Sequence, residues 1–144
     1  MTRAAPSPAS SSARERAGAT GVTLDEREVA RFERMAAEWW DPNGKFRPLH
    51  QIGPPRIGFV RDQILAHFSR PAGGLKPLQD LTILDIGCGG GLIAEPMARM
   101  GGKVAGLDPG ALNIAIARDH ASPQDLAIDY RVGTAEEFLA EGRS

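Results

Sequence analysis

Residues 81–91 read Leu-Thr-Ile-Leu-Asp-Ile-Gly-Cys-Gly-Gly-Gly, an apolar run that leads directly into a glycine-rich turn. Such a run is typical of a buried strand, and glycines let the backbone turn sharply into a helix and approach a ligand closely. Asp85 precedes the first glycine, and Asp108 ends the next apolar run. An acid about 20 residues after such a turn can accept hydrogen bonds from ribose hydroxyls. The stretch therefore predicts a site for a cofactor that contains a ribose.

The spacing of the glycines distinguishes between classes of cofactor. Gly87, Gly89 and Gly91 alternate with other residues, and Leu92 stands where the dinucleotide pattern Gly-x-Gly-x-x-Gly has its last glycine. An acid before the turn suits a cationic amine better than a pyrophosphate. The predicted cofactor is S-adenosylmethionine, which carries an ammonium, a sulfonium and a ribose but no phosphate. A dinucleotide-dependent dehydrogenase and a glycine-rich loop without a ligand remain as alternatives.

The composition limits the classes of protein to consider. The 144 residues, 42% of them hydrophobic, suffice for one modest domain with a core. A formal net charge of −1 does not favour nucleic acid or an anionic membrane as the main partner. The single cysteine, Cys88, excludes an internal disulfide, and its place inside the turn favours a small buried filler over a nucleophile. No Cys/His spacing indicates a metal site, and no apolar run approaches the ~18 residues that span a bilayer.

Three segments are predicted along the chain. Residues 1–22, rich in Ala, Ser and Pro, are expected to form a disordered tail. Residues 23–80 are expected to be helical, with one helix that begins at the capping box Thr23-x-x-Glu26 and a second that begins at Pro54-Pro55. The first helix would bury Val29, Phe32, Ala36 and Trp39, and the second Ile57, Val60, Ile64 and Phe68.

From residue 81 to residue 144 the pattern alternates between strand and helix. Strands are expected at residues 81–86, 103–108 and 127–132, and helices after Leu92, at 111–120 and after Thr134. This alternation predicts an α/β fold with a parallel sheet, in which ligands bind at the carboxyl ends of the strands. Asp85, Asp108 and the start of the last helix should meet at that edge. Ala135 and Glu136 are expected to face the adenine, although the capping of a helix explains this segment equally well.

The residues from Leu84 to Gly91 resemble the first motif of class I S-adenosylmethionine-dependent methyltransferases, and Gly106-Leu107-Asp108 resembles their second-strand acid. The stretch from Phe32 to His50, which contains Trp39-Trp40-Asp41-Pro42, is similar to the amino-terminal signature of the ubiquinone-biosynthesis O-methyltransferases. The resemblance covers roughly residues 25–140. It implies a Rossmann-like methyltransferase fold and methylation of phenolic hydroxyls on polyprenylated ubiquinone precursors.

The resemblance also implies roles for individual residues. By position, the cofactor contacts of the family fall on Arg56, Gly87 and Asp108. A guanidinium suits the carboxylate of the methionine moiety, a glycine allows close approach, and a carboxylate accepts from ribose hydroxyls. No residue is assigned as the catalytic base or as a metal ligand, and whether the reaction needs a metal stays open. The predicted cofactor contacts are Arg56, Asp85, Gly87, Gly89, Gly91, Asp108, Ala135 and Glu136.

Three other side chains have more than one interpretation, and a fourth, His120, has one. Trp39 and Trp40 fit either a packing anchor between the amino-terminal helix and the sheet or a wall of the binding site. His50 fits either a proton acceptor or a hydrogen-bonded structural residue. His120 is expected to be a residue of the helix surface.

In the resembled family the first strand lies between the second and the fourth, and this sequence ends at Ser144 before a fourth strand. The sequence therefore predicts the amino-terminal half of the fold, with residues 81–86 as an unpaired apolar edge. Such a chain is expected to bind the cofactor weakly or not at all and to show no measurable turnover. An alternative is a non-catalytic S-adenosylmethionine-binding or partner module that completes its sheet by strand addition.

The resemblance implies partners and a location as well. The expected partners are a polyprenylated phenol or quinol substrate and other proteins of ubiquinone biosynthesis, with no nucleic acid. The expected location is cytoplasmic, with at most peripheral association with the inner membrane, or the mitochondrial matrix in a eukaryote.

Overall fold

The computed structural model of the chain describes the backbone of residues 11–142 and the side chains of residues 26–142. The chain divides into two compact units, Met1–Arg34 and Met35–Ser144. The second unit contains the sheet, the helices around it and the candidate site. The part of the predicted tail that covers residues 1–10 lies outside the described residues.

The first helix, α1 (Ser11–Trp40), is longer than the sequence predicted. The expected start at Thr23 is wrong, and residues 11–22 are helical where a disordered tail was expected. Residues 11–22 contain three alanines and two arginines, residue types with high helix propensity. Val29 was expected on a buried face, but 53% of its surface is exposed.

The second helix, α2 (Arg47–His67), also begins before the predicted start. Pro48 occupies its first turn, where a proline is tolerated, and Pro54 and Pro55 lie inside the helix. The motif Pro-Pro was therefore wrongly interpreted as the helix start. Three of the four predicted core residues, Ile57, Val60 and Ile64, pack against the core as expected. Phe68 follows the end of the helix and is 54% exposed, so its predicted burial is wrong.

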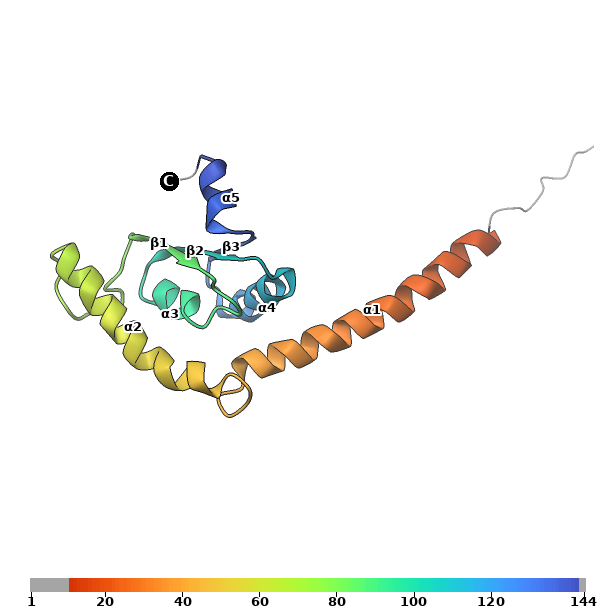
Figure 1. Ribbon diagram of the computed structural model, residues 1–144, viewed down its shortest axis with the longest axis horizontal. Helices are drawn as coiled ribbons and strands as arrows, with labels where there is room; N and C mark the ends of the chain where they lie inside the picture. The colour runs from red at the N-terminus through yellow and green to blue at the C-terminus, as the bar shows by residue number, and fades with distance from the viewer. Residues whose placement is uncertain (1–10, 143–144) are drawn as a thin grey trace, which may run out of the picture. The chain divides into compact units, whose positions relative to one another are not determined.

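The sheet has three parallel strands in the order β1-β2-β3, as predicted for the amino-terminal part of an open α/β fold (Figure 1). Thr82 pairs with Lys103 in the first ladder, and Ala105 pairs with Asp129 in the second. The first strand pairs only with the second among the described residues, which leaves it at the edge of the sheet. The strands are β1 (Thr82–Ile86), β2 (Lys103–Asp108) and β3 (Asp129–Val132).

Helices connect the strands where the sequence placed them. Pro96 lies in the first turn of α3 (Ala94–Arg99), as its missing N–H requires. The helix α4 (Ala111–Ala121) continues into a 3₁₀ helix, Ser122–Gln124.

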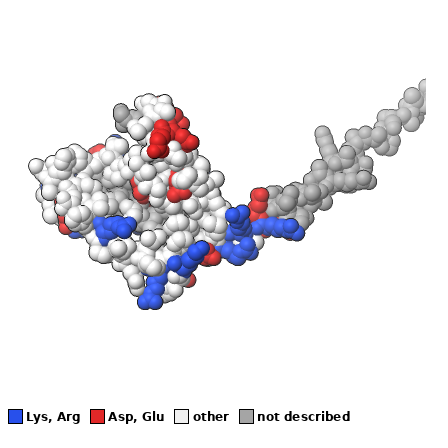
Figure 2. Space-filling view, in the orientation of Figure 1, with Lys and Arg blue, Asp and Glu red and all other residues white. Residues whose placement is uncertain are grey.

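Thr134 caps α5 (Ala135–Ala140) in a reciprocal capping box with Glu137, which confirms the predicted cap. On the face shown in Figure 2, acidic side chains gather over α5, where Glu136 and Glu137 complement the helix dipole.

The two faces of the sheet differ in how they are covered. Figure 1 shows α3 and α4 on one side of the sheet and α5 on the other. Residues of α3, α4 and β3 form the core on the first side, with Met97, Ile114 and Tyr130 almost fully buried. On β1, the alternate residues Leu84 and Ile86 are 40% and 60% exposed. The side chains of Ile83 and Asp85, which alternate with these two residues along the strand, point to the covered side.

None of the helices within residues 11–142 combines the length and the apolar character that crossing a membrane requires.

Candidate cofactor site

A small cavity lies at the carboxyl end of β1, where ligands of parallel sheets bind. Its volume is about 130 Å³. The end of α1 and the first half of α2 provide one wall, and the residues that follow β1 provide the other. The lining residues are Trp39, Leu49, Gly53, Arg56, Asp85, Gly87, Cys88, Gly89, Leu92 and Ile93.

Asp85 is the only acid among the described residues that line this cavity. Its Oδ2 atom is buried and has no hydrogen-bond partner among the described residues. Burial raises the pKa of the Asp85 carboxyl from 3.8 to about 6, and the negative charge of Asp108 adds to the rise. A buried carboxylate without a partner is costly, and a bound cation would relieve that cost. The geometry therefore suits a positively charged ligand group.

Arg56 brings a positive charge to the same cavity from α2. Its side chain is exposed, and it forms no hydrogen bond or ion pair with another described residue. A guanidinium in this state is available to a carboxylate, which it can bind through two parallel hydrogen bonds. The cavity thus offers one anionic and one cationic group to a zwitterion.

The glycines of the turn have different physical roles. Gly87 has φ +74°, and no atom lies within 4 Å of the position where a Cβ would stand, so its backbone borders open space. At Gly89 a Cβ would lie 2.5 Å from the Trp39 ring, and at Gly90 it would lie 2.9 Å from the same ring. Gly87 therefore keeps the cavity accessible, whereas the next two glycines allow an indole to pack on the turn.

Gly91 contacts the core and not the cavity. It has φ +97°, and a Cβ there would lie 2.5 Å from the Tyr130 hydroxyl. Burial raises the pKa of Tyr130 above its usual range, and the charge of Glu95 adds to the rise. The hydroxyl has no hydrogen-bond partner among the described residues.

Asp108 is buried at the end of β2 and does not line the cavity. Its Oδ2 accepts from the backbone N–H of Gly89 at 3.0 Å, and its Oδ1 accepts from the N–H of Gly110 at 2.8 Å. The Asn113 amide also donates to Oδ1, at 3.3 Å. These bonds join the end of β2 to the glycine turn. Contact between Asp108 and a ribose stays a prediction.

The two tryptophans have different roles: Trp39 forms part of the cavity wall, and Trp40 packs against another ring. Trp39 lines the cavity, stacks on Phe46 at 4.1 Å between ring centroids, and donates from Nε1 to the Asn113 side chain at 3.2 Å. Trp40 instead stacks on His120, with centroids 3.5 Å apart and planes 3° from parallel. His120 was expected on the helix surface, and that expectation is wrong because the ring is partly buried under Trp40.

His50 has the structural role that the sequence left as one of its alternatives. Its Nε2 lies 2.8 Å from the backbone oxygen of Trp39. Cys88 is buried, which confirms the small buried filler that the sequence predicted. Burial raises the pKa of its thiol to about 12, and the charges of Asp85 and Asp108 add to the rise. A thiol with so high a pKa is a poor nucleophile near neutral pH.

Only some of the predicted cofactor contacts come together in the cavity lining. Those that line it are Arg56, Asp85, Gly87 and Gly89. Those that lie outside the lining are Gly91, Asp108, Ala135 and Glu136. The cavity also has an apolar wall that the motifs did not reveal, because nothing local in the sequence distinguishes its members from core residues. This wall consists of Leu49, Leu92 and Ile93.

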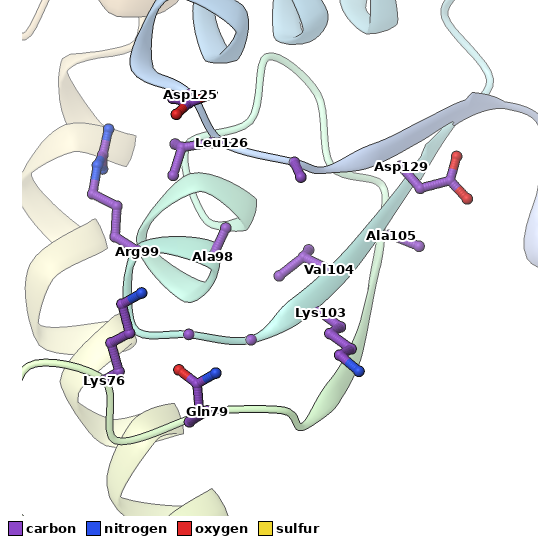
Figure 3. Close-up of a pocket in the computed structure, with 13 residues that line it drawn as sticks. Lys76, Gln79, Ala98, Arg99, Lys103, Val104, Ala105, Asp125, Leu126 and Asp129 are labelled. Carbon is purple, nitrogen blue, oxygen red and sulfur yellow. The ribbon is translucent and has the colours of Figure 1, made fainter.

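A larger hollow, of about 720 Å³, lies at the opposite ends of the strands (Figure 3). Lys76, Arg99 and Lys103 border it together with Asp125 and Asp129. It contains neither the glycine turn nor Asp85, and ligands of parallel sheets bind at the carboxyl ends of the strands. The smaller cavity is therefore the better candidate. Within the described part of the chain, no three His, Cys, Asp or Glu side chains come together as a metal site.

Comparison with known proteins shows that the chain is similar to methyltransferases. Residues 83–144 match a family described as a methyltransferase domain. The chain is 54% identical over 121 residues to the ubiquinone biosynthesis O-methyltransferase of Azorhizobium caulinodans, an alignment that covers 84% of this chain and 48% of the relative. It is 53% identical over 123 residues to the protein of the same name from Sinorhizobium medicae, with coverage of 85% and 50%.

The chain thus spans about half the length of the curated relatives it matches. Among solved structures, WbdD in complex with the kinase inhibitor LY294002 superposes with a TM-score of 0.51 at 25% identity, over 72% of this chain and 22% of that chain. The chain is therefore similar to the ubiquinone biosynthesis O-methyltransferases over about half of their length, and its residues 83–144 match a methyltransferase domain.

Proposed function

We propose that the cavity at the end of β1 binds the methionine moiety of S-adenosylmethionine. We further propose that this chain is part of an O-methyltransferase that methylates phenolic hydroxyls of polyprenylated ubiquinone precursors. The observation that carries the first proposal is the buried Asp85 oxygen without a described partner, in a cavity that also contains Arg56. The names of the relatives support the second.

The charges of the cavity match those of the ligand. Methyltransferase domains generally use S-adenosylmethionine, whose methionine end carries a carboxylate, an ammonium and a sulfonium. Arg56 would hold the carboxylate and Asp85 the cationic groups, while Gly87 allows the ligand to approach the backbone. When bound, the cofactor supplies a methyl group to an oxygen nucleophile by in-line displacement. The residues of this chain bind and align it, which is most of what such a reaction needs from a protein.

The size of the cavity predicts weak binding by this chain alone. Sites that enclose a whole cofactor-sized ligand measure roughly 300–1,000 Å³. The cavity of about 130 Å³ can enclose only part of the ligand, so the adenosine would extend beyond it. We therefore expect measurable affinity only at high ligand concentration and no turnover, in agreement with the expectation from the sequence.

Calorimetric titration of the chain with S-adenosylmethionine and, separately, with NADH tests the cofactor class. The chain should give saturable heat with the first ligand and none with the second. Asp85→Asn should abolish that heat, because it removes the charge that faces the cation. Asp80→Asn is the matched control, because Asp80 is an exposed acid that precedes β1 and does not line the cavity. Equal binding of both ligands, or an unchanged affinity in Asp85→Asn, would contradict the proposal.

The exposed edge of β1 supports a second candidate function, a non-catalytic module that completes its sheet by strand addition. Leu84 and Ile86 on this strand are partly exposed. Size-exclusion chromatography with light scattering separates the candidates. A defined dimer or complex that forms through β1 favours the module, whereas a monomer or a soluble aggregate favours part of an enzyme.

We also propose that any association with a membrane is peripheral and follows from a lipid-like substrate. Vesicle sedimentation with and without a polyprenylated phenol in the bilayer tests this. Binding that does not depend on the phenol would contradict it.

A further inference from the structure

We propose that His120 and Glu95 are positioning residues that hold the tryptophan wall of the cofactor cavity, a role that rests on the proposed function of that cavity. Neither residue lines the cavity. They act on it through Trp40, which precedes the Asp41-Pro42 turn and follows the cavity residue Trp39 directly in the chain.

Glu95 lies on α3 with its side chain completely buried. Its Oε2 lies 2.6 Å from His120 Nδ1. Its Oε1 accepts from Arg99 at 2.9 Å and from the Gln124 amide at 2.9 Å. Arg99 and Gln124 compensate the buried carboxylate in part, and His120 completes its set of partners. As an acceptor, Glu95 favours the proton on Nδ1 and orients the imidazole, and the Gln124 amide nitrogen lies 3.0 Å from the same ring nitrogen.

The imidazole that Glu95 orients packs against an indole. The ring of His120 lies almost parallel to that of Trp40, with centroids 3.5 Å apart. His50 contacts the same indole edge-on, with centroids 6.4 Å apart. Trp40 is therefore held between two imidazoles, of which only His120 is stacked face to face.

The stack is linked to the cavity through the backbone. Trp39 packs on Gly89 and Gly90 and forms part of the cavity wall. Because Trp39 and Trp40 are adjacent, their backbone cannot shift at one residue without shifting at the other. Trp39 has its own contacts with Phe46 and Asn113. Loss of the Trp40 stack is therefore expected to loosen the wall formed by Trp39 and not to abolish it. The apparent cofactor affinity of the chain then falls in proportion to the fraction of molecules in which the wall is formed.

Substitutions at His120 test the proposal in the 144-residue chain. His120→Ala removes both the stack and the bond to Glu95, His120→Phe restores an aromatic ring, and His120→Gln restores a polar group without the ring. We expect His120→Ala and His120→Gln to weaken S-adenosylmethionine binding by between about two-fold and ten-fold, the range for the loss of an aromatic pair. His120→Phe, which keeps a ring but cannot bond to Glu95, should recover only part of the affinity. Asp119→Ala, at an exposed neighbour on α4, is the control that should bind as the wild type does.

Tryptophan fluorescence provides a readout that does not depend on the ligand. The chain has two tryptophans, Trp39 and Trp40, so its entire indole emission reports on this wall. Acrylamide should quench the emission more strongly in His120→Ala than in the wild type, His120→Phe or Asp119→Ala. Should His120→Ala fail to fold, the comparison of His120→Phe with His120→Gln carries the test.

Three outcomes are decisive. Weaker binding together with stronger quenching in the variants without a ring supports the proposal. Unchanged affinity in those variants refutes it and leaves the proposed function intact. Absence of S-adenosylmethionine binding by the wild-type chain at millimolar ligand refutes the proposed function, and the positioning role with it, whatever the fluorescence shows.

Discussion

Replacing Asp85 with asparagine should stabilise the protein and weaken its binding of the cofactor. In the folded chain the pKa of Asp85 is raised from 3.8 to about 6 by burial and by the charge of Asp108. Each pH unit of such a rise corresponds to about 1.4 kcal/mol. Keeping the carboxylate ionised at neutral pH therefore costs the folded state up to about 3 kcal/mol. Because the side chain is partly open to solvent, which screens the charge, we expect Asp85→Asn to recover about half of this, roughly 1–2 kcal/mol.

The sign of the pH dependence follows from the direction of the pKa shift. Between pH 3.8 and about 6 the unfolded chain has released this proton while the folded chain still holds it. The stability of the wild type should therefore fall as the pH rises through this interval and then level off. Asp85→Asn cannot ionise, so the difference in stability between the two proteins should grow over the same interval.

Urea denaturation of wild type, Asp85→Asn and Asp80→Asn between about pH 4 and pH 8 measures this difference. Calorimetry at neutral pH should show at least about a ten-fold loss of S-adenosylmethionine affinity in Asp85→Asn, because a charge-assisted contact is lost. Stability and binding then change in opposite directions. A variant that is less stable than the wild type at neutral pH, or one that binds equally well, would refute the reasoning.

Three further substitutions address the turn, the core and the second charge of the cavity. Gly91→Ala should lower the free energy of unfolding by about 2–4 kcal/mol in urea, since a Cβ at φ +97° would lie 2.5 Å from the Tyr130 hydroxyl; a loss near zero would contradict this. Tyr130→Phe should raise the free energy of unfolding by about 1 kcal/mol, because the buried hydroxyl has no hydrogen-bond partner among the described residues. Destabilisation would instead show that the hydroxyl forms a hydrogen bond in solution. Arg56→Lys should weaken cofactor binding about ten-fold with no change in unfolding, because a lysine lacks the planar fork, and unchanged calorimetric affinity would remove Arg56 from the site.

The positions of the strands could be predicted from the sequence, whereas the residues at which the two amino-terminal helices begin could not. The second strand has the predicted limits, Lys103–Asp108, because an apolar run lies between a glycine pair and an acid that ends it. The start of α2 was misplaced because Pro54 and Pro55 are usually signals for a helix start, and here the helix continues through them. Which proline begins a helix depends on the residues that pack around it, and a local pattern does not contain that information.

Some residues of the candidate site could also be predicted from a local pattern, and others could not. Asp85 and the glycines could be found from a local motif, because a tight turn beside a ligand leaves few choices of residue. Arg56 was predicted only from the resemblance, since an arginine early in a helix is otherwise a common surface residue. The stack between Trp40 and His120 joins residues that are remote in sequence, so no spacing rule could reveal it.

The residues that build the cavity come from both sides of the boundary of the matched domain. The family match begins at residue 83, but Trp39, Leu49, Gly53 and Arg56 precede it and form one whole wall. The domain alone would present Asp85 on an open surface, where water would screen its charge and lower its preference for a cation. The amino-terminal segment encloses that carboxylate and brings the arginine that complements it. The stretch around Trp39-Trp40-Asp41-Pro42 therefore contributes to the cavity at the end of β1 itself, in addition to any part it has in recognising a substrate.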